Sequence, residues 1–257
     1  MQAANFTLDR YFARIGLARP ARFDAAALAE TMRAQLFAVP FENLDVQAGR
    51  EISLEPEDIV AKIVDHRRGG YCYEVNGLFA LALEALGVSW RFVAARPMFY
   101  PVRRPRTHVA IVAEIDGRSF LCDLGFGSWG IRAPIDLADL DRPIEQDGDT
   151  FRLSRQAGGV HVLSALVEGD WKTQYGFDLS PQEWVDFAPA NYLNSHHPDA
   201  IFVQKPVVLR FHARGRTVLV GDTLKRHVDG RLEVRDIAPA ERAAVLAEEF
   251  ALSMPSA

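Results

Sequence analysis

The hydrophobic pattern of this 257-residue chain changes its period at Val88. Before that residue, apolar side chains recur every three or four positions, which indicates α-helices. After it, apolar and polar side chains alternate, which indicates β-strands. The change separates a helical region, residues 1–87, from a β region over residues 88–190. Helical and strand patterns mix beyond that point, so we predict a small α/β region over residues 191–257.

Local signals set the limits of the expected helices in the first region. Gly16 ends a first helix over residues 8–15, Asp24 caps a second, and Pro40 breaks it. A third helix is expected to start near Pro56 and to run towards Arg67.

Strand signals dominate the rest of the chain. A further helix is expected to start at Ser180, with Glu183 completing a capping box, and to end between Tyr192 and Ser195. A last helix covers residues 239–250. The expected strands cover residues 90–96, 108–115, 118–124, 151–153, 160–166, 171–177, 207–212, 217–221 and 232–237.

Two glycines and a cysteine precede the most apolar of the predicted helices. The sequence 69–72, Gly-Gly-Tyr-Cys, leads into a run whose apolar residues recur from Val75 to Leu86. Cys72 is therefore expected at a helix N-terminus, where unpaired N–H groups and the helix dipole favour negative charge. A thiol in that setting is suited to react as a thiolate. The alternative is a small buried hydrophobic side chain, the commoner role of a cysteine.

Charge and cysteine content narrow the classes of function. A net charge of −5 argues against a protein that binds nucleic acid. The two cysteines, Cys72 and Cys122, are too few for a disulfide framework and fit a reducing compartment. The first ten residues have no long apolar core, and no run of about 18 apolar residues follows. We therefore expect a cytoplasmic protein with no membrane partner; a homodimer remains open.

A hairpin signal relates two further polar residues. The dipeptide Asp116-Gly117 between two strand patterns is typical of a two-residue type I′ turn. With that turn, Ile115 pairs with Arg118, and the register extends to Asp123. His108 then lies on the same face as Asp123, as a diagonal neighbour that a hydrogen bond can reach.

These residues form the set needed for a Cys-His-Asp triad. In that interpretation Cys72 attacks as a thiolate, His108 transfers protons, and Asp123 fixes the imidazole tautomer. Cys122 points to the opposite face of the hairpin and is a poor partner. The alternatives are a hydrogen-bonded strand histidine for His108 and a loop-capping carboxylate for Asp123. Asn76, in the first turn of the Cys72 helix, is interpreted as a bridge to neighbouring loops.

Several separated motifs resemble those of the arylamine N-acetyltransferases. The resemblance covers residues 11–202 and is weaker beyond. Its motifs are RGGYCYEVN at 68–76, VPFENLD at 39–45, Thr107-His108, DLGFG at 123–127, and NYLNSHHP at 191–198 with Phe202.

The resemblance implies an α+β fold of three domains: an N-terminal helical bundle (1–87), a central β-barrel (88–190) and a C-terminal α/β lid (191–257). It also implies the triad Cys72, His108 and Asp123. Acetyl-CoA would be the co-substrate, with no metal, and ping-pong transfer would pass the acetyl group to an arylamine, arylhydrazine or arylhydroxylamine. The matching positions imply substrate contacts from Phe41, Thr107, Phe126 and Phe202, and approach of the cofactor at Gly125 and Gly127.

Other interpretations remain open at this stage. The same triad would serve an amide synthase of polyketide biosynthesis, a hydrolase or transglutaminase-like enzyme, or a binding protein that retains only the fold. Pro97 replaces the aliphatic residue that usually lines the family's pocket, which bears on acceptor preference. The basic run 103–106 either meets the phosphates of CoA or is an exposed loop. His196 and His197 lack the partners of a metal site, so a solvated loop is favoured.

Overall fold

The computed structural model describes residues 1–254. Its helical region surrounds one buried helix, α5, whose residues from Cys72 to Leu83 are all buried. A helix that is apolar on every side belongs in a core, and α5 contacts both α4 and strands β2 and β3. The elements of this region are α1 (Leu8–Ile15), α2 (Ala25–Ala38), β1 (Phe41–Glu42), α3 (Leu44–Gln47), α4 (Pro56–Val60), the π-helix η1 (Ala61–Asp65) and α5 (Cys72–Ala85).

The first two helices have the predicted ends. Gly16 adopts the left-handed conformation at the C-terminus of α1, and the Asp24 carboxylate accepts the N–H groups of Ala26 and Ala27 at the start of α2. The third predicted helix is shorter than expected. It changes from α to π geometry after Val60 and ends at Asp65, before the left-handed backbone of Arg67 (φ 53°).

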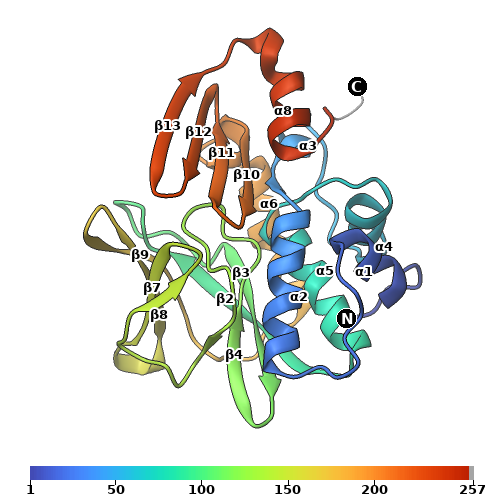
Figure 1. The fold of residues 1–257 in the computed structure, drawn as a ribbon, viewed down its shortest axis with the longest axis vertical. Helices are drawn as coiled ribbons and strands as arrows, with labels where there is room; N and C mark the ends of the chain where they lie inside the picture. Colours follow the sequence, from blue (N-terminus) through green and yellow to red (C-terminus); the bar gives the residue numbers. More distant parts are fainter. Residues whose placement is uncertain (255–257) are drawn as a thin grey trace.

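The β region is one antiparallel sheet of eight strands, which curls into a half-barrel (Figure 1). The strand order is β5-β4-β3-β2-β9-β8-β7-β6. Its apolar face and the helical region share one continuous hydrophobic core. The elements are β2 (Ser89–Pro97), β3 (His108–Ile115), β4 (Arg118–Cys122), β5 (Ile135–Asp136), β6 (Ile144–Gln146), β7 (Asp149–Arg155), the 3-10 helix η2 (Ala157–Gly159), β8 (His161–Val167) and β9 (Asp170–Phe177).

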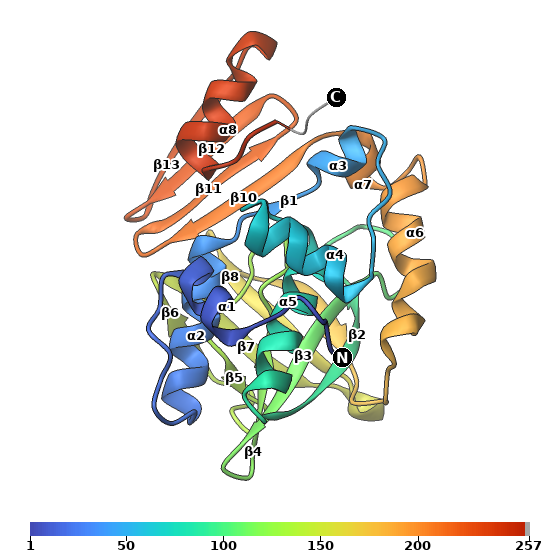
Figure 2. The ribbon, with the colours of Figure 1, turned by 90° about the vertical axis from the view of Figure 1, so that its right-hand side faces the viewer.

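A second sheet and helix α8 form the C-terminal part at one end of the molecule (Figures 1 and 2). The strand order is β1-β10-β11-β12-β13, so the helical region contributes the first strand of this sheet. A separate apolar cluster beneath α8 includes Leu219, Leu246 and Phe250. The elements are η3 (Trp184–Phe187), α6 (Ala188–His196), α7 (Ile201–Gln204), β10 (Val207–His212), β11 (Gly215–Val220), β12 (Thr223–Val228), β13 (Arg231–Asp236), η4 (Pro239–Glu241) and α8 (Arg242–Phe250).

The architecture is the predicted α+β fold of three domains, with one helix start corrected. Ser180 does not cap a helix, because the Asp178 carboxylate accepts the Ser180 N–H (3.1 Å) and holds the chain in a turn. The helix begins at Ala188, after a 3-10 turn in which Asp186 accepts the N–H of Glu183 (2.8 Å). The predicted limit at residue 190 falls inside α6, and the exact domain limits stay predictions.

Candidate active site

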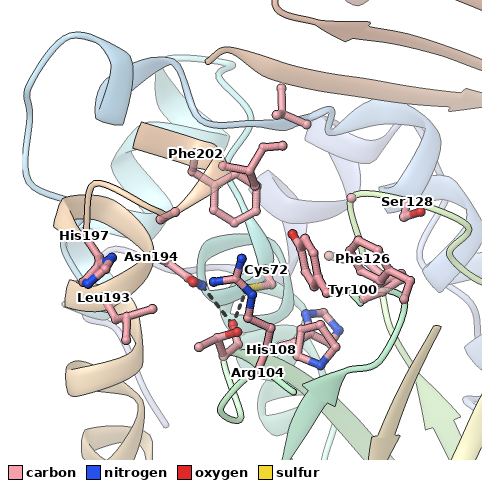
Figure 3. Close-up of a pocket in the computed structure, with 18 of the residues that line it drawn as sticks. Cys72, Tyr100, Arg104, His108, Phe126, Ser128, Leu193, Asn194, His197 and Phe202 are labelled. Carbon is pink, nitrogen blue, oxygen red and sulfur yellow. Dashed lines mark hydrogen bonds between the residues drawn. The ribbon is translucent and has the colours of Figure 1, made fainter. Parts of the chain in front are cut away.

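A cavity of about 360 Å³ lies where the three regions meet, and Figure 3 shows part of its lining. It receives side chains from the helical region (Cys72), the β region (His108) and the C-terminal part (Phe202). Eight of the nine residues that the sequence singles out line it: Phe41, Cys72, Thr107, His108, Gly125, Phe126, Gly127 and Phe202. The ninth, Asp123, contacts His108.

Cys72 is the first residue of α5, as predicted, and its side chain faces the cavity. The residue is 4% exposed, and its Sγ lies 4.0 Å from the carbonyl oxygen of Thr107. Glu74 accepts the N–H of Tyr71 (3.0 Å) and so helps to fix the start of the helix. Because α5 has 14 residues, the positive end of a full helix dipole is directed at the thiol.

The β3–β4 hairpin brings His108 and Asp123 together in the predicted register. Ile115 pairs with Arg118, and the Nε2 atom of His108 lies 2.7 Å from Oδ2 of Asp123. Cys122 is a buried free thiol, and burial together with the neighbouring Asp123 charge raises its pKa. Cys122 is therefore unsuited to act as a nucleophile.

Burial and two neighbours act on the pKa of His108 in opposite directions. Burial is the largest single effect and lowers the pKa, but the charge and hydrogen bond of Asp123 together with those of Cys72 outweigh it. The net effect raises the pKa of His108 from 6.5 to about 10. A buried imidazolium is thus favoured at neutral pH, beside a carboxylate on one side and a thiol on the other.

Asn76 holds Asp123 and the loop that follows it. Its Nδ2 donates to Oδ1 of Asp123 (3.2 Å) and to the carbonyl of Val109 (2.8 Å), while its Oδ1 accepts the N–H of Leu124 (2.9 Å). The N–H of Gly125 also donates to Oδ1 of Asp123 (2.9 Å). One carboxylate oxygen is therefore saturated by two donors, which leaves Oδ2 for the histidine. The bridging interpretation of Asn76 is confirmed.

The two glycines of the 123–127 loop are needed for close contacts within the protein. A Cβ atom on Gly125 would lie 2.5 Å from Cα of Cys72, and one on Gly127 would lie 2.8 Å from the ring of Phe41. The loop thus packs directly against the first residue of α5. This is a reason for glycine at these positions in addition to the expected approach of a cofactor.

Aromatic rings form much of the cavity wall. The ring centroids of Phe41 and Phe202 are 5.7 Å apart, and Phe126 lies 5.0 Å from the ring of His108. Phe99 contacts Phe126 in turn (5.8 Å). Such a wall suits a flat, apolar ligand. Pro97 also lines the cavity.

Thr107 takes part through its backbone. Its carbonyl oxygen accepts hydrogen bonds from the hydroxyl of Tyr73 (3.0 Å) and from Nδ2 of Asn194 (2.9 Å). Sequence reasoning missed Asn194 and Tyr100, which also line the cavity. Asn194 lies in the NYLNSHHP motif, but nothing in the local sequence indicates that α6 reaches the cavity.

The paired histidines make local contacts. The Nδ1 atom of His196 lies 2.8 Å from Oγ of Ser195, and the ring of His197 accepts the N–H of Asp199 (3.2 Å). Among residues 1–254 there is no group of three or more His, Cys, Asp or Glu side chains that could hold a metal ion. Within the same residues, each helix is too short or too polar to cross a membrane.

Comparison with known proteins gives concordant results. A family model described as N-acetyltransferase matches residues 24–257. The arylamine N-acetyltransferase of Mycolicibacterium smegmatis is 36% identical over 247 residues, which cover 89% of this chain and 88% of that protein. The crystal structure of the Nocardia farcinica arylamine N-acetyltransferase matches with a TM-score of 0.91 and 36% identity, covering 98% of this chain and 91% of that one. The structure of the Mycobacterium marinum arylamine N-acetyltransferase in complex with CoA matches with a TM-score of 0.88 and 30% identity, covering 95% and 92%.

Proposed function

This chain belongs to the arylamine N-acetyltransferase family and is an acyltransferase, and on that premise we propose that it moves an acetyl group from acetyl-CoA to an arylamine, arylhydrazine or arylhydroxylamine through a thioester on Cys72. The observation that carries the proposal is the arrangement at the cavity. A thiol at a helix N-terminus lies beside a histidine whose Nε2 is 2.7 Å from a buried carboxylate. This set of groups is suited to nucleophilic catalysis by cysteine, because it combines the nucleophile, a base and a group that orients the base.

The first half-reaction forms the thioester. The Cys72 thiolate attacks the carbonyl carbon of acetyl-CoA, and the bond from that carbon to the CoA sulfur breaks. The leaving sulfur takes a proton from the imidazolium of His108, whose raised pKa keeps it protonated at neutral pH. Free CoA departs, and a neutral imidazole remains beside the acetylated cysteine.

The second half-reaction returns the enzyme to its starting state. The nitrogen of the acceptor attacks the thioester carbonyl, and His108 takes the proton that this nitrogen loses. The bond to the sulfur of Cys72 then breaks, which restores the thiolate and the imidazolium. Asp123 keeps the imidazole in one orientation throughout, because its other oxygen is held by two N–H donors.

The acceptor and the co-substrate would share the cavity. Phe41, Phe126 and Phe202 would contact the aromatic ring of the acceptor, with Thr107 fixing the edge of the site through its carbonyl. The Mycobacterium marinum relative in complex with CoA supports acetyl-CoA as the donor. The loop of Gly125 and Gly127, which also lines the cavity, is where we place its closest approach. A cytoplasmic location is part of the proposal, supported by two free cysteines.

The test is the mass of the intact protein after mixing with acetyl-CoA. We expect one added acetyl group, no addition in Cys72→Ala, and loss of the group when an arylhydrazine is added. Loss to water at the same rate with and without the hydrazine would instead indicate a hydrolase. No acetylation of a folded protein whose thiol reacts with iodoacetamide would refute acetyl-CoA as donor and favour an amide synthase.

A further inference from the structure

Arg104 is a cationic side chain in the cavity wall without an anionic partner. It lies in the connection between β2 and β3, and Figure 3 shows it reaching into the space that Cys72 and Asn194 also line. Its Nε is buried and forms no hydrogen bond. Among residues 1–254 no carboxylate lies within ion-pair distance of its guanidinium. A buried N–H donor on a charged group is costly to leave unpaired, so this site favours an anionic ligand.

Neighbouring contacts hold Arg104 in position. Nη1 of Arg96 donates to the backbone carbonyl of Arg104, and the Arg104 guanidinium lies 4.8 Å from the ring centroid of Tyr100. Arg106, two residues on, pairs instead with Asp178. Arg96 of strand β2 thus fixes the backbone of the loop, and Arg106 anchors its end. The charge of Arg104 is left facing the cavity.

Asp199 is the other charged residue in the lining besides the catalytic pair. It is exposed to solvent and does not pair with Arg104, so water and salt screen its charge. The thiolate and imidazolium would neutralise one another. Asp123 adds a negative charge, but it is not part of the cavity lining, and its oxygens are bound by His108 and by two N–H donors. Within the lining, Arg104 is therefore the positive charge that the acceptor would meet.

We propose that Arg104 binds an anionic substituent on the aromatic ring of the acceptor, so that this enzyme prefers arylamines that carry a carboxylate. The inference rests on the proposed acetyl transfer and adds the class of acceptor. A planar guanidinium can bind a carboxylate through two parallel hydrogen bonds while the aromatic wall holds the ring. The phosphates of acetyl-CoA are the alternative anion. They are separated from the reacting thioester by the whole pantetheine arm, whereas Arg104 and Cys72 line the same small cavity.

The test compares kcat/KM for 4-aminobenzoate and 3-aminobenzoate with that for the matching aminobenzamides. The ratio of acid to amide is compared between the wild type and Arg104→Gln, so that intrinsic differences in amine reactivity cancel. We expect Arg104→Gln to lower this ratio roughly tenfold to a hundredfold, the usual range for loss of a charged hydrogen bond. Arg103→Gln removes the same charge from an exposed position on the same loop and should leave the ratio unchanged.

Two further measurements identify the source of the anion. They also distinguish failure of this proposal from failure of the proposed acetyl transfer. The rate of CoA release in the first turnover should be the same in Arg104→Gln as in the wild type. A slower release with an unchanged acid-to-amide ratio would overturn the proposal and assign Arg104 to the CoA phosphates. Binding of 4-aminobenzoate to Cys72→Ala, with and without Arg104→Gln, is followed by NMR and needs no turnover. It would reveal the subsite even if acetyl transfer itself were refuted.

An acid-to-amide ratio that Arg104→Gln changes less than twofold, together with unchanged binding to Cys72→Ala, would also overturn the proposal. If Arg104→Gln did not fold, Arg104→Lys would take its place. That variant keeps the charge but loses the two-point geometry, and it should lower the ratio by a smaller factor.

Discussion

Replacing Asp123 by asparagine would invert one hydrogen bond in the site. Oδ1 of Asp123 accepts the N–H of Gly125 (2.9 Å) and an N–H of Asn76 (3.2 Å), so the amide oxygen of the new side chain must occupy that position. Its NH2 group then faces Nε2 of His108, where Oδ2 now lies at 2.7 Å. An NH2 group donates, so the imidazole must place its own proton on Nδ1.

The expected loss of activity follows from the charge that is removed. The pKa of His108 is raised from 6.5 to about 10 against the effect of burial, and Asp123 is the main cause of the rise. Removing the carboxylate forfeits most of a roughly thousandfold gain in the proton affinity of His108, and with it the same factor in the stability of the thiolate–imidazolium pair. The wrong tautomer has a comparable cost, about ten-thousandfold in a triad enzyme. We therefore expect Asp123→Asn to slow acetylation of Cys72 roughly a thousandfold to ten-thousandfold.

The assay is the release of CoA in a single turnover, detected with a thiol reagent. Circular dichroism should show a folded Asp123→Asn variant, because the amide oxygen keeps the hydrogen bonds from the Gly125 N–H and from Nδ2 of Asn76. Asp136→Asn is the matched control: Asp136 is a buried carboxylate that pairs with Arg118 outside the cavity, and its loss should change the rate less than twofold. A folded Asp123→Asn that kept more than a tenth of the wild-type rate would refute the reasoning.

Two further predictions concern the packing and the charge of the site. Gly125→Ala would place a Cβ 2.5 Å from the backbone of Cys72, and we expect about 1–3 kcal/mol of destabilisation in urea unfolding together with slow acetylation. Gly127→Ala should be milder because it meets the tip of the Phe41 ring, and equal losses in the two variants would contradict this account. The folded-state pKa of His108 lies above its ordinary value, so its stabilisation is complete below about pH 6.5 and is lost as the pH rises through about 10. The Tm difference between wild type and His108→Gln should therefore narrow from pH 7 to pH 10, and a difference independent of pH would exclude a charged His108.

The hairpin could be predicted from sequence because its turn is determined locally. Asp116 and Gly117 both have positive φ (50° and 74°), as a type I′ turn requires, and this turn fixes the register as far as Asp123. The relation of His108 to Asp123 follows from strand geometry alone. The helix start at Cys72 is likewise a local property, given by the two glycines and the apolar run after them.

Contacts between distant segments could not be predicted in this way. The approach of the 123–127 loop to Cys72 depends on how α5 packs against the half-barrel, and the bond from Asn194 to the Thr107 carbonyl depends on where α6 lies. Strand β12 (Thr223–Val228) was missed because its sequence is largely polar and its alternation is weak. The capping-box pattern predicts a cap at Ser180 because it does not include Asp178, the residue whose carboxylate holds the turn.

Strand β1 has consequences for the order in which this chain can fold. Phe41 pairs with Leu209 and also lines the cavity, so one wall of the site depends on a contact between the first and last quarters of the chain. Contacts so distant in sequence close late, and synthesis releases the N-terminal part first. The helix that holds Cys72 and the hairpin that holds His108 can therefore form before β10 exists. During synthesis the helix start that holds Cys72 can therefore be in place before the cavity wall that depends on β10 is complete.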